Sequence, residues 1–244
     1  MTDAFWVTVP RDVVQVSGPD ALTYLHGQTS QGLLDMAVGE SRWTFLLQPA
    51  GKVEVLARVR RTAEETFVFD VDAGFGEALV ARLNRFKIRV KADVEPLPWR
   101  VVAVRGVSGA DDIVAADPRP PEGVREGSLE ELERLRIAEG WPAMGAEIVP
   151  GETIPAETGV VPVAVDFTKG CYPGQELVER MDSRGASAPR RLRVLTVDDG
   201  SEPGDPIVLD GAEVGVLTSV AGTRALGLVR RSVELGDEPG AVRA

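Results

Sequence analysis

The chain has 244 residues, of which 43% are hydrophobic, and its 27 basic and 38 acidic residues give a net charge of −11. This composition is typical of a globular protein of one or two domains, and the negative charge disfavours nucleic acid and anionic lipid unless cations gather locally. One cysteine and one histidine exclude a disulfide scaffold, a thiolate zinc finger and a multi-histidine metal site. No apolar run is long enough to cross a membrane, and the N-terminus lacks a cationic start before an apolar stretch, so we expect a cytoplasmic protein.

The first hundred residues predict a sheet with two helices, because apolar residues alternate in some segments and recur at helical spacing in others. The predicted strands cover residues 7–9, 13–16, 43–47, 52–59, 66–71, 88–92 and 100–104, and the predicted helices cover 21–26 and 76–86. Trp43 and Arg58 fall on two of these strands, and neither carries a functional signal there.

The rest of the chain begins with a turn-rich loop over residues 106–127 and then changes to short strands. Ser128 and Glu131 have capping-box spacing, which predicts a helix that carries Leu129 inward and ends near Gly140. After Pro189, Gly and Asp separate four strand-like segments, over residues 192–197, 206–209, 213–220 and 224–230. We therefore expect an α+β body over residues 1–188 and a small C-terminal β-barrel over residues 189–244.

The segment richest in reactive side chains is residues 166–180, which reads as a strand end, a turn and the start of a helix. Pro173 fits a first helical turn, and Gly174 leaves room for another group to approach the backbone. Cys171 lies just before the helix and two residues from Lys169, an arrangement that favours a reactive thiolate. The same spacing also fits a buried, inert Cys171 within a simple chain reversal.

Residues 169–176, Lys-Gly-Cys-Tyr-Pro-Gly-Gln-Glu, resemble the K-G-C-Y-x-G-Q-E signature of the YgfZ family, the folate-binding relatives of the glycine-cleavage T-protein. Residues 11–34 are similar to the family's opening motif, and residues 82–91 to its helix-to-strand passage. Arg184-Gly185 and residues 190–192 are similar to the stretch after the signature. The resemblance covers most of residues 10–195, with a short terminal barrel as in these relatives.

This resemblance implies a T-protein-like α+β fold, tetrahydrofolate or a one-carbon derivative in a central cavity, and a role in making or maintaining iron–sulfur enzymes. The implied partners are iron–sulfur client or assembly proteins. Some members are also linked to tRNA thio-modification. The signature positions carried over are Lys169, Cys171, Tyr172, Gly174, Gln175 and Glu176.

We expect the signature turn to border the folate cavity. Tyr172 would offer a flat face to the ligand and orient it with Gln175. Lys169 and Arg184 would meet the glutamate tail. Glu176 would hold the turn by accepting backbone N–H bonds. Cys171 would lie at the cavity mouth, able to exchange a sulfur, a carbon unit or an electron pair.

Two departures from the T-protein pattern bear on the alternative function, a folate-dependent aminomethyl- or methyl-transferase. Where T-proteins carry paired aspartates, one of them catalytic, this chain has Glu54 and Val55. The acid that contacts the pterin in T-proteins is displaced here by one residue, to Glu139. One residue rotates a helical side chain by about 100°, so we do not expect Glu139 to be a folate ligand.

A third hypothesis, tRNA binding, rests on a cluster of arginines near the end of the body. Five of them fall within fourteen residues, namely Arg180, Arg184, Arg190, Arg191 and Arg193. Such a group of arginines could hold a polyglutamate tail or an RNA phosphate, and it fits a solvated charged face equally well.

We do not expect the chain to carry an iron–sulfur cluster by itself. One cysteine per chain cannot supply the four thiolates that such clusters usually take.

Overall fold

The computed structural model describes residues 4–109, 111–183 and 188–233. The strands are β1 (Phe5–Val9), β2 (Arg11–Ser17), β3 (Ser41–Leu47), β4 (Val53–Ala63), β5 (Thr66–Asp72), β6 (Asp93–Leu97), β7 (Arg100–Arg105), β8 (Ile113–Ala115), β9 (Arg125–Glu126), β10 (Arg190–Thr196), β11 (Pro206–Leu209), β12 (Ala212–Ala221) and β13 (Arg224–Arg230). The helices are α1 (Ala21–His26), α2 (Gly76–Arg85), α3 (Leu129–Ala138), the 3₁₀ turn η1 (Pro155–Glu157), α4 (Val161–Ala164) and α5 (Gln175–Ser183). None of the helices in these ranges is long and apolar enough to cross a membrane.

The largest sheet has the strand order β3-β4-β5-β2-β6, and all of its neighbouring strands are antiparallel. Helix α2 packs against β2, β4 and β6, and α4 packs against β3. Alternating residues of β4 and β5 point into a core whose largest fully buried side chains include Phe45, Phe67 and Phe69. The strands predicted over residues 52–59 and 66–71 are thereby confirmed, since β4 and β5 cover almost all of both segments.

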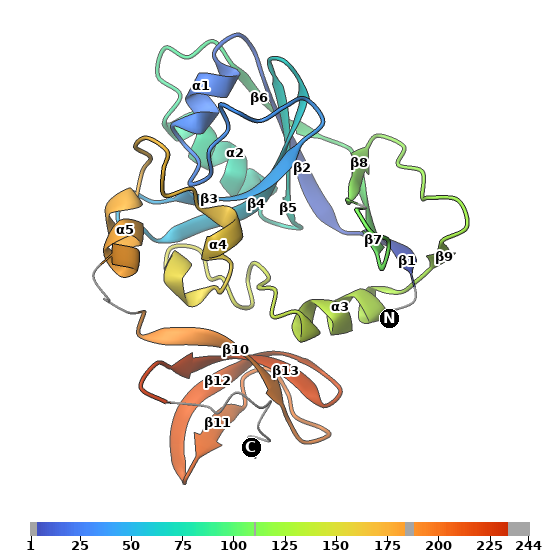
Figure 1. Ribbon diagram of the computed structural model, residues 1–244, viewed down its shortest axis with the longest axis vertical. Coiled ribbons are helices and arrows are strands. Elements are labelled where there is room, and N and C mark those ends of the chain that lie inside the picture. The colour runs from blue at the N-terminus through green and yellow to red at the C-terminus, as the bar shows by residue number, and fades with distance from the viewer. Residues whose placement is uncertain (1–3, 110, 184–187, 234–244) are drawn as a thin grey trace.

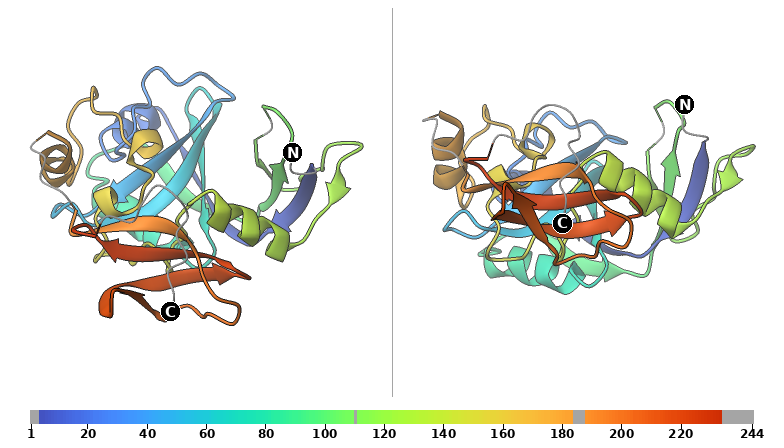
Figure 2. Two further views of the ribbon diagram at one scale, coloured as in Figure 1. Left: turned by 60° about the horizontal axis from the view of Figure 1, so that its bottom comes forward. Right: turned by 90° about the horizontal axis from the view of Figure 1, so that it is seen from below.

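A second sheet, with the order β8-β7-β1-β9, stands apart from the first in Figure 1. Strands β1 and β2 are separated only by Pro10, so the chain passes almost directly from this sheet into the first. Helix α3 packs against β1 and also contacts β12 and β13. It therefore lies between the second sheet and the C-terminal part, as Figure 2 shows.

The C-terminal part is a four-stranded antiparallel sheet with the order β10-β13-β12-β11. Its own core contains Leu195, Ile207, Leu217 and Val229, separate from the core of the first sheet. All four strands predicted after Pro189 are present within about two residues of their predicted bounds, the usual uncertainty of strand ends. Strand β10 is an edge strand whose other side lies against η1.

Three expectations about local structure are wrong. Residues 88–92 are not a strand. Arg89 has φ 58° and Ile88 is 78% exposed, so this segment turns the chain between α2 and β6. Leu129 is 50% exposed rather than packed inward. Pro173 is not in the first turn of α5, because Gly174 has φ 85°, outside the helical range, and the helix begins at Gln175.

Candidate functional site

The signature turn, residues 169–176, is held by Lys169 against the end of α1 and the chain that follows it. The ammonium of Lys169 donates to the carbonyls of His26 and Thr29 and lies 5.0 Å from the centre of the Tyr172 ring. Burial lowers the pKa of Lys169 to about 8, although Asp166 opposes this shift. The lysine therefore joins the turn to the chain that follows α1, with its charge satisfied by backbone oxygens.

Tyr172 belongs to the core of the first sheet and is 8% exposed. Burial, reinforced by the charges of Glu179 and Asp166, raises the pKa of its hydroxyl to about 12. The backbone N–H of Tyr172 donates to Oε1 of Gln175 at 3.1 Å. Glu176 is exposed and accepts no hydrogen bond within the described ranges, so Gln175, and not Glu176, bonds the turn.

Gly174 brings the turn into direct contact with the β3–β4 hairpin. Its φ is 85°, and a Cβ placed on it would lie 2.6 Å from the carbonyl oxygen of Gln48 and 3.0 Å from Cα of Gly51. Gly51 is close-packed in turn, since a Cβ there would lie 2.4 Å from Cβ of Leu177 in α5. Only glycine fits at these two contact points, so residues 174 and 51 fix α5 on the hairpin.

Cys171 is a free, exposed cysteine. Arg184, the other predicted folate contact, lies outside the described residues. Two cavities in the described parts of the chain, of about 540 and 400 Å³, are lined by residues outside the signature turn. Apart from Cys171 and Glu176, which are exposed, the side chains of the signature turn pack within the body, and its expected place beside the folate stays a prediction.

The first of the two, which we call the central cavity, lies between the first sheet, the second sheet and α3, and has a volume of about 540 Å³. Its aromatic wall is formed by Trp43 on β3 and Trp141, which follows α3. Their ring centres are 4.7 Å apart and their planes are inclined by 54°. The guanidiniums of Arg11 and Arg58 lie 5.8 and 5.6 Å from the Trp43 ring centre, within the range of a cation–π interaction.

The polar wall of the central cavity is dense in charge of both signs. Its charged lining residues are Arg11, Arg58, Asp72, Arg105, Asp111, Asp112, Glu133, Arg136 and Glu139. Carboxylates that accept hydrogen bonds and guanidiniums that donate them thus surround the two tryptophans. A flat, polar, partly anionic molecule suits such a lining.

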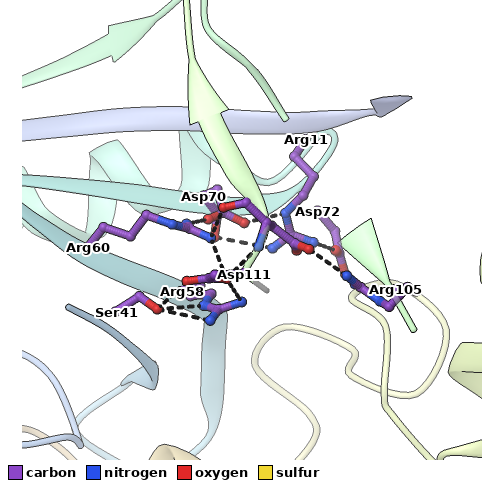
Figure 3. A network of polar contacts seen from close by, with 9 residues as sticks. Arg11, Ser41, Arg58, Arg60, Asp70, Asp72, Arg105 and Asp111 are labelled. Carbon is purple, nitrogen blue, oxygen red and sulfur yellow. Dashed lines mark hydrogen bonds and ion pairs between the residues drawn. The ribbon is translucent and has the colours of Figure 1, made fainter. Parts of the chain in front are cut away.

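Much of this charge is organised by a network around Asp70, shown in Figure 3. Asp70 is fully buried on β5 and pairs with Arg11 at 2.5 Å and with Arg60 of β4. Arg11 also pairs with Asp72 at 2.5 Å. Because each of these arginines has a carboxylate partner, the network fixes the direction of its side chain.

The same network reaches across to the second sheet. Arg58 pairs with Asp111, whose other oxygen accepts from Ser41 Oγ at 2.7 Å, and Arg105 pairs with Asp112 at 2.5 Å. Burial lowers the pKa of Arg58 although Asp111 opposes the shift. The loop between β7 and β8 is therefore attached to β4 through charge pairs at the rim of the central cavity.

Helix α3 is anchored at the cavity by Arg136. Its guanidinium donates to Glu133 at 2.6 Å, to the fully buried Glu147 at 3.0 Å, to the Trp141 carbonyl at 2.6 Å and to Ser219 of β12 at 2.7 Å. One side chain therefore connects the helix, the tryptophan wall and the C-terminal sheet. Glu139, the residue after α3, lines the cavity despite its one-residue displacement.

Glu54 lies elsewhere. Its carboxylate is 3.4 Å from Nε of the fully buried Arg82, and it does not line the central cavity. Val55 is fully buried. The position where a transferase would need its acid is therefore apolar, and the one acid that remains nearby neutralises a buried arginine.

The four described members of the arginine cluster near the end of the body lie in different surroundings, and the fifth, Arg184, lies outside the described residues. Arg190 pairs with the buried Glu157 at 3.0 Å, whereas Arg191 and Arg193 line the second cavity. Arg180 is exposed on α5. This division gives no support to a continuous RNA-binding face.

The spacing of charged residues on two strands is a sequence signal for the polar wall that the sequence analysis missed. Arg58 and Arg60 lie two residues apart on β4, and Asp70 and Asp72 lie two apart on β5. Arg58 is opposite Asp70 in the observed register. An Arg-x-Arg strand next to an Asp-x-Asp strand predicts a row of charge pairs between the strands. The prediction requires knowing that the two strands are neighbours in the sheet, which the sequence analysis did not establish.

Comparison with known families and structures agrees with this architecture. Residues 190–242 match the model described as the CAF17 C-terminal beta-barrel domain. The crystal structure of glycine cleavage system aminomethyltransferase T from Bartonella henselae superposes with a TM-score of 0.73 at 18% identity, covering 96% of this chain and 80% of that one. The predicted T-protein-like fold with a C-terminal β domain is thereby confirmed.

Several relatives are named iron–sulfur cluster assembly factor IBA57 or its homologue, mitochondrial. The human protein is 27% identical over 267 residues, which cover 90% of this chain and 75% of that protein. The Pyricularia oryzae protein is 30% identical over 237 residues (83% and 60%), and that of Neurospora crassa 25% over 238 residues (80% and 54%). The chain thus spans little more than half the length of the two fungal proteins. Taken together, the barrel domain, these relatives and the T-protein fold confirm the resemblance to the YgfZ family.

Proposed function

We propose that this YgfZ-family chain is a folate-binding protein that supports the assembly or repair of iron–sulfur proteins, with tetrahydrofolate or a one-carbon derivative held in the central cavity. The observation that carries the proposal is the lining of that cavity. Two tryptophans face a set of carboxylates and guanidiniums within about 540 Å³, a volume within the usual range of small-molecule sites.

Each part of a folate has a matching group in this lining. The pterin and the aminobenzoyl ring are flat and stack on aromatic rings such as Trp43 and Trp141. The amino and N–H edge of the pterin donates hydrogen bonds, which suits the carboxylate of Glu139 or Asp72. The glutamate tail is anionic, and Arg58, Arg105 and Arg136 supply guanidiniums at the same cavity.

In this proposal the signature turn supports the site and presents Cys171 to a partner. Lys169, Tyr172, Gly174 and Gln175 hold the turn on the first sheet, and the thiol remains exposed beside them. With one cysteine in the chain, further cluster ligands have to come from the iron–sulfur partner. Cys171 would then contribute one thiolate beside the ligands of that partner rather than hold a cluster alone.

The proposed iron–sulfur role rests on relatives that match most of this chain and are named iron–sulfur cluster assembly factors. A tRNA link has no support from them. We propose the cytoplasm as the site of action, in line with a relative from the bacterium Haemophilus influenzae that is 25% identical over 190 residues.

The cellular test is complementation of a strain of the source organism that lacks this gene. Wild type is expected to restore the activity of an iron–sulfur dehydratase measured in extracts, and Trp141→Leu is expected to restore much less. Trp99→Leu, which changes a tryptophan outside the central cavity, is the matched control and should restore activity like wild type. Equal dehydratase activity with and without the gene would contradict the proposed role.

A further inference from the structure

A second cavity, of about 400 Å³, lies between the body and the C-terminal sheet. Its wall on the body side is mostly apolar and is built by η1, α4, α5 and the segments that join them. The apolar lining there includes Val161, Pro162, Phe167, Leu177, Val178 and Met181. Phe167 is 42% exposed, so a large aromatic ring faces the opening.

The opposite wall is cationic. Arg191, Leu192 and Arg193 of β10 line it, together with Arg231, which follows β13. The Arg231 backbone N–H donates to the Pro189 carbonyl at 3.0 Å, which holds this arginine beside the start of β10. Three arginines therefore line a cavity whose other side is mostly apolar.

None of these three guanidiniums has a hydrogen-bond or ion-pair partner among residues 4–109, 111–183 and 188–233. Arg191 and Arg193 are half-buried. A partly buried charge without a partner is unfavourable, and it becomes favourable when an anion joins it. Arg190, one residue earlier, shows the usual alternative, since it pairs with Glu157.

The acids in the lining offset only part of this charge. Glu157 is already neutralised by Arg190, and the other acid, Asp182, is exposed on α5. In a chain with a net charge of −11, this cavity is a local concentration of positive charge. Its electrostatics select an anion over a cation.

We infer that the second cavity binds a small amphipathic anion, with an apolar chain or ring and a carboxylate or phosphate head. The apolar part packs between Phe167 and Met181, and the head group accepts hydrogen bonds from Arg191 and Arg193. This site shares no lining residue with the central cavity, so it stands apart from the proposed folate site.

Calorimetric titration of the full chain with decanoate, decyl phosphate and decanol, all below their micelle concentrations, tests the inference. One molecule of decanoate or decyl phosphate is expected to bind per chain with a dissociation constant below about 1 mM, and the tighter of the two identifies the head group. Decanol, which has the chain without the charge, should bind about tenfold more weakly or not at all.

Variants locate the site. The double variant Arg191→Gln and Arg193→Gln is expected to weaken binding of the anion about tenfold or more. Arg224→Gln removes an exposed arginine of β13 outside the cavity and should leave it unchanged. Met181→Trp fills the apolar end and should abolish binding. Unaltered thermal unfolding and tetrahydrofolate affinity would show that each variant is folded.

Three results would overturn the inference: no saturable binding of either anion, equal affinity for decanol and decanoate, or unchanged affinity in both the double arginine variant and Met181→Trp. None of them bears on the central cavity. Absence of tetrahydrofolate binding by the wild type would in turn contradict the proposed function and leave this site standing.

Discussion

At the scale of single residues, the signature turn is explained by packing. Gly174 allows α5 to approach the hairpin, Lys169 bonds two carbonyls, and Tyr172 fills the core. Each of these residue types suits that structural position for a physical reason that needs no ligand. Cys171 and Glu176 differ from them, because both side chains are exposed.

Gly174→Ala is expected to lower the free energy of unfolding by about 3–4 kcal/mol, since it combines left-handed strain with a clash against the hairpin backbone. Gly200→Ala is the matched control. Gly200 has φ 91°, and a Cβ placed on it would meet nothing within 4 Å, so it should show the strain alone, about 1–2 kcal/mol. Urea unfolding measures the free energy of unfolding of both variants. An equal decrease in both would show that the contact at Gly174 is not tight.

Lys169 gives the stability a pH dependence of known sign. Its pKa is about 8 when folded, below the ordinary 10.5, so between these values the unfolded chain binds the extra proton. The difference in unfolding free energy, wild type minus Lys169→Met, should therefore be constant below pH 8 and rise with pH between about 8 and 10. Urea unfolding at several pH values gives this difference, and a decrease over that interval would contradict the buried position of the ammonium.

At the scale of elements, α3 determines the shape of the central cavity. Ser128 caps it as the capping-box spacing predicted, with Oγ accepting from the Glu131 N–H at 3.1 Å. Arg136 then ties it to Glu147 and to Ser219. The position of the C-terminal sheet is therefore coupled, through α3, to the cavity wall that Trp141 and Glu139 form.

Arg136→Ala is expected to lower the free energy of unfolding by about 3 kcal/mol, because the fully buried Glu147 loses its charged partner. Arg134→Ala breaks the exposed i,i+4 pair with Glu130 on the same helix and should cost less than about 0.5 kcal/mol. Thermal and urea unfolding compare the two. Similar effects of both variants would show that Arg136 does not act through the buried carboxylate.

How much of this could be predicted from the sequence depended on the range of the interactions. The strands of the C-terminal sheet and the cap at Ser128 follow from local patterns, and both were predicted correctly. Residues 88–92 alternated like a strand, yet the pairing partner of β2 is β6, so a tertiary choice overrode the local pattern. The central cavity could not be predicted, because Trp43, Arg58 and Trp141 meet only when the two sheets and α3 are in place.

At the scale of the whole molecule, three parts of the chain surround the central cavity, and charge pairs join them. The network of Figure 3 connects the first sheet with the loop before β8, and Arg136 connects α3 with the C-terminal sheet. A ligand that contacts residues from several parts binds only when all are assembled. Folate binding is therefore expected to stabilise the whole protein rather than one part.

The prediction at this scale is that saturating tetrahydrofolate raises the temperature of unfolding, with one transition for all parts. At a hundred times the dissociation constant the ligand should add about 2.7 kcal/mol. Differential scanning calorimetry with and without ligand measures it. An unchanged transition at saturating tetrahydrofolate would contradict binding to the folded state.

The location of the folate is tested most directly by isothermal titration of tetrahydrofolate into wild type, Trp141→Leu, Trp99→Leu and Lys169→Met. Wild type and Trp99→Leu should bind in the micromolar range, about −8 kcal/mol, and Trp141→Leu about tenfold more weakly because a stacking face is lost. Lys169→Met should keep wild-type affinity as long as it remains folded. Full affinity in Trp141→Leu together with a loss in Lys169→Met would move the ligand from the central cavity to the signature turn.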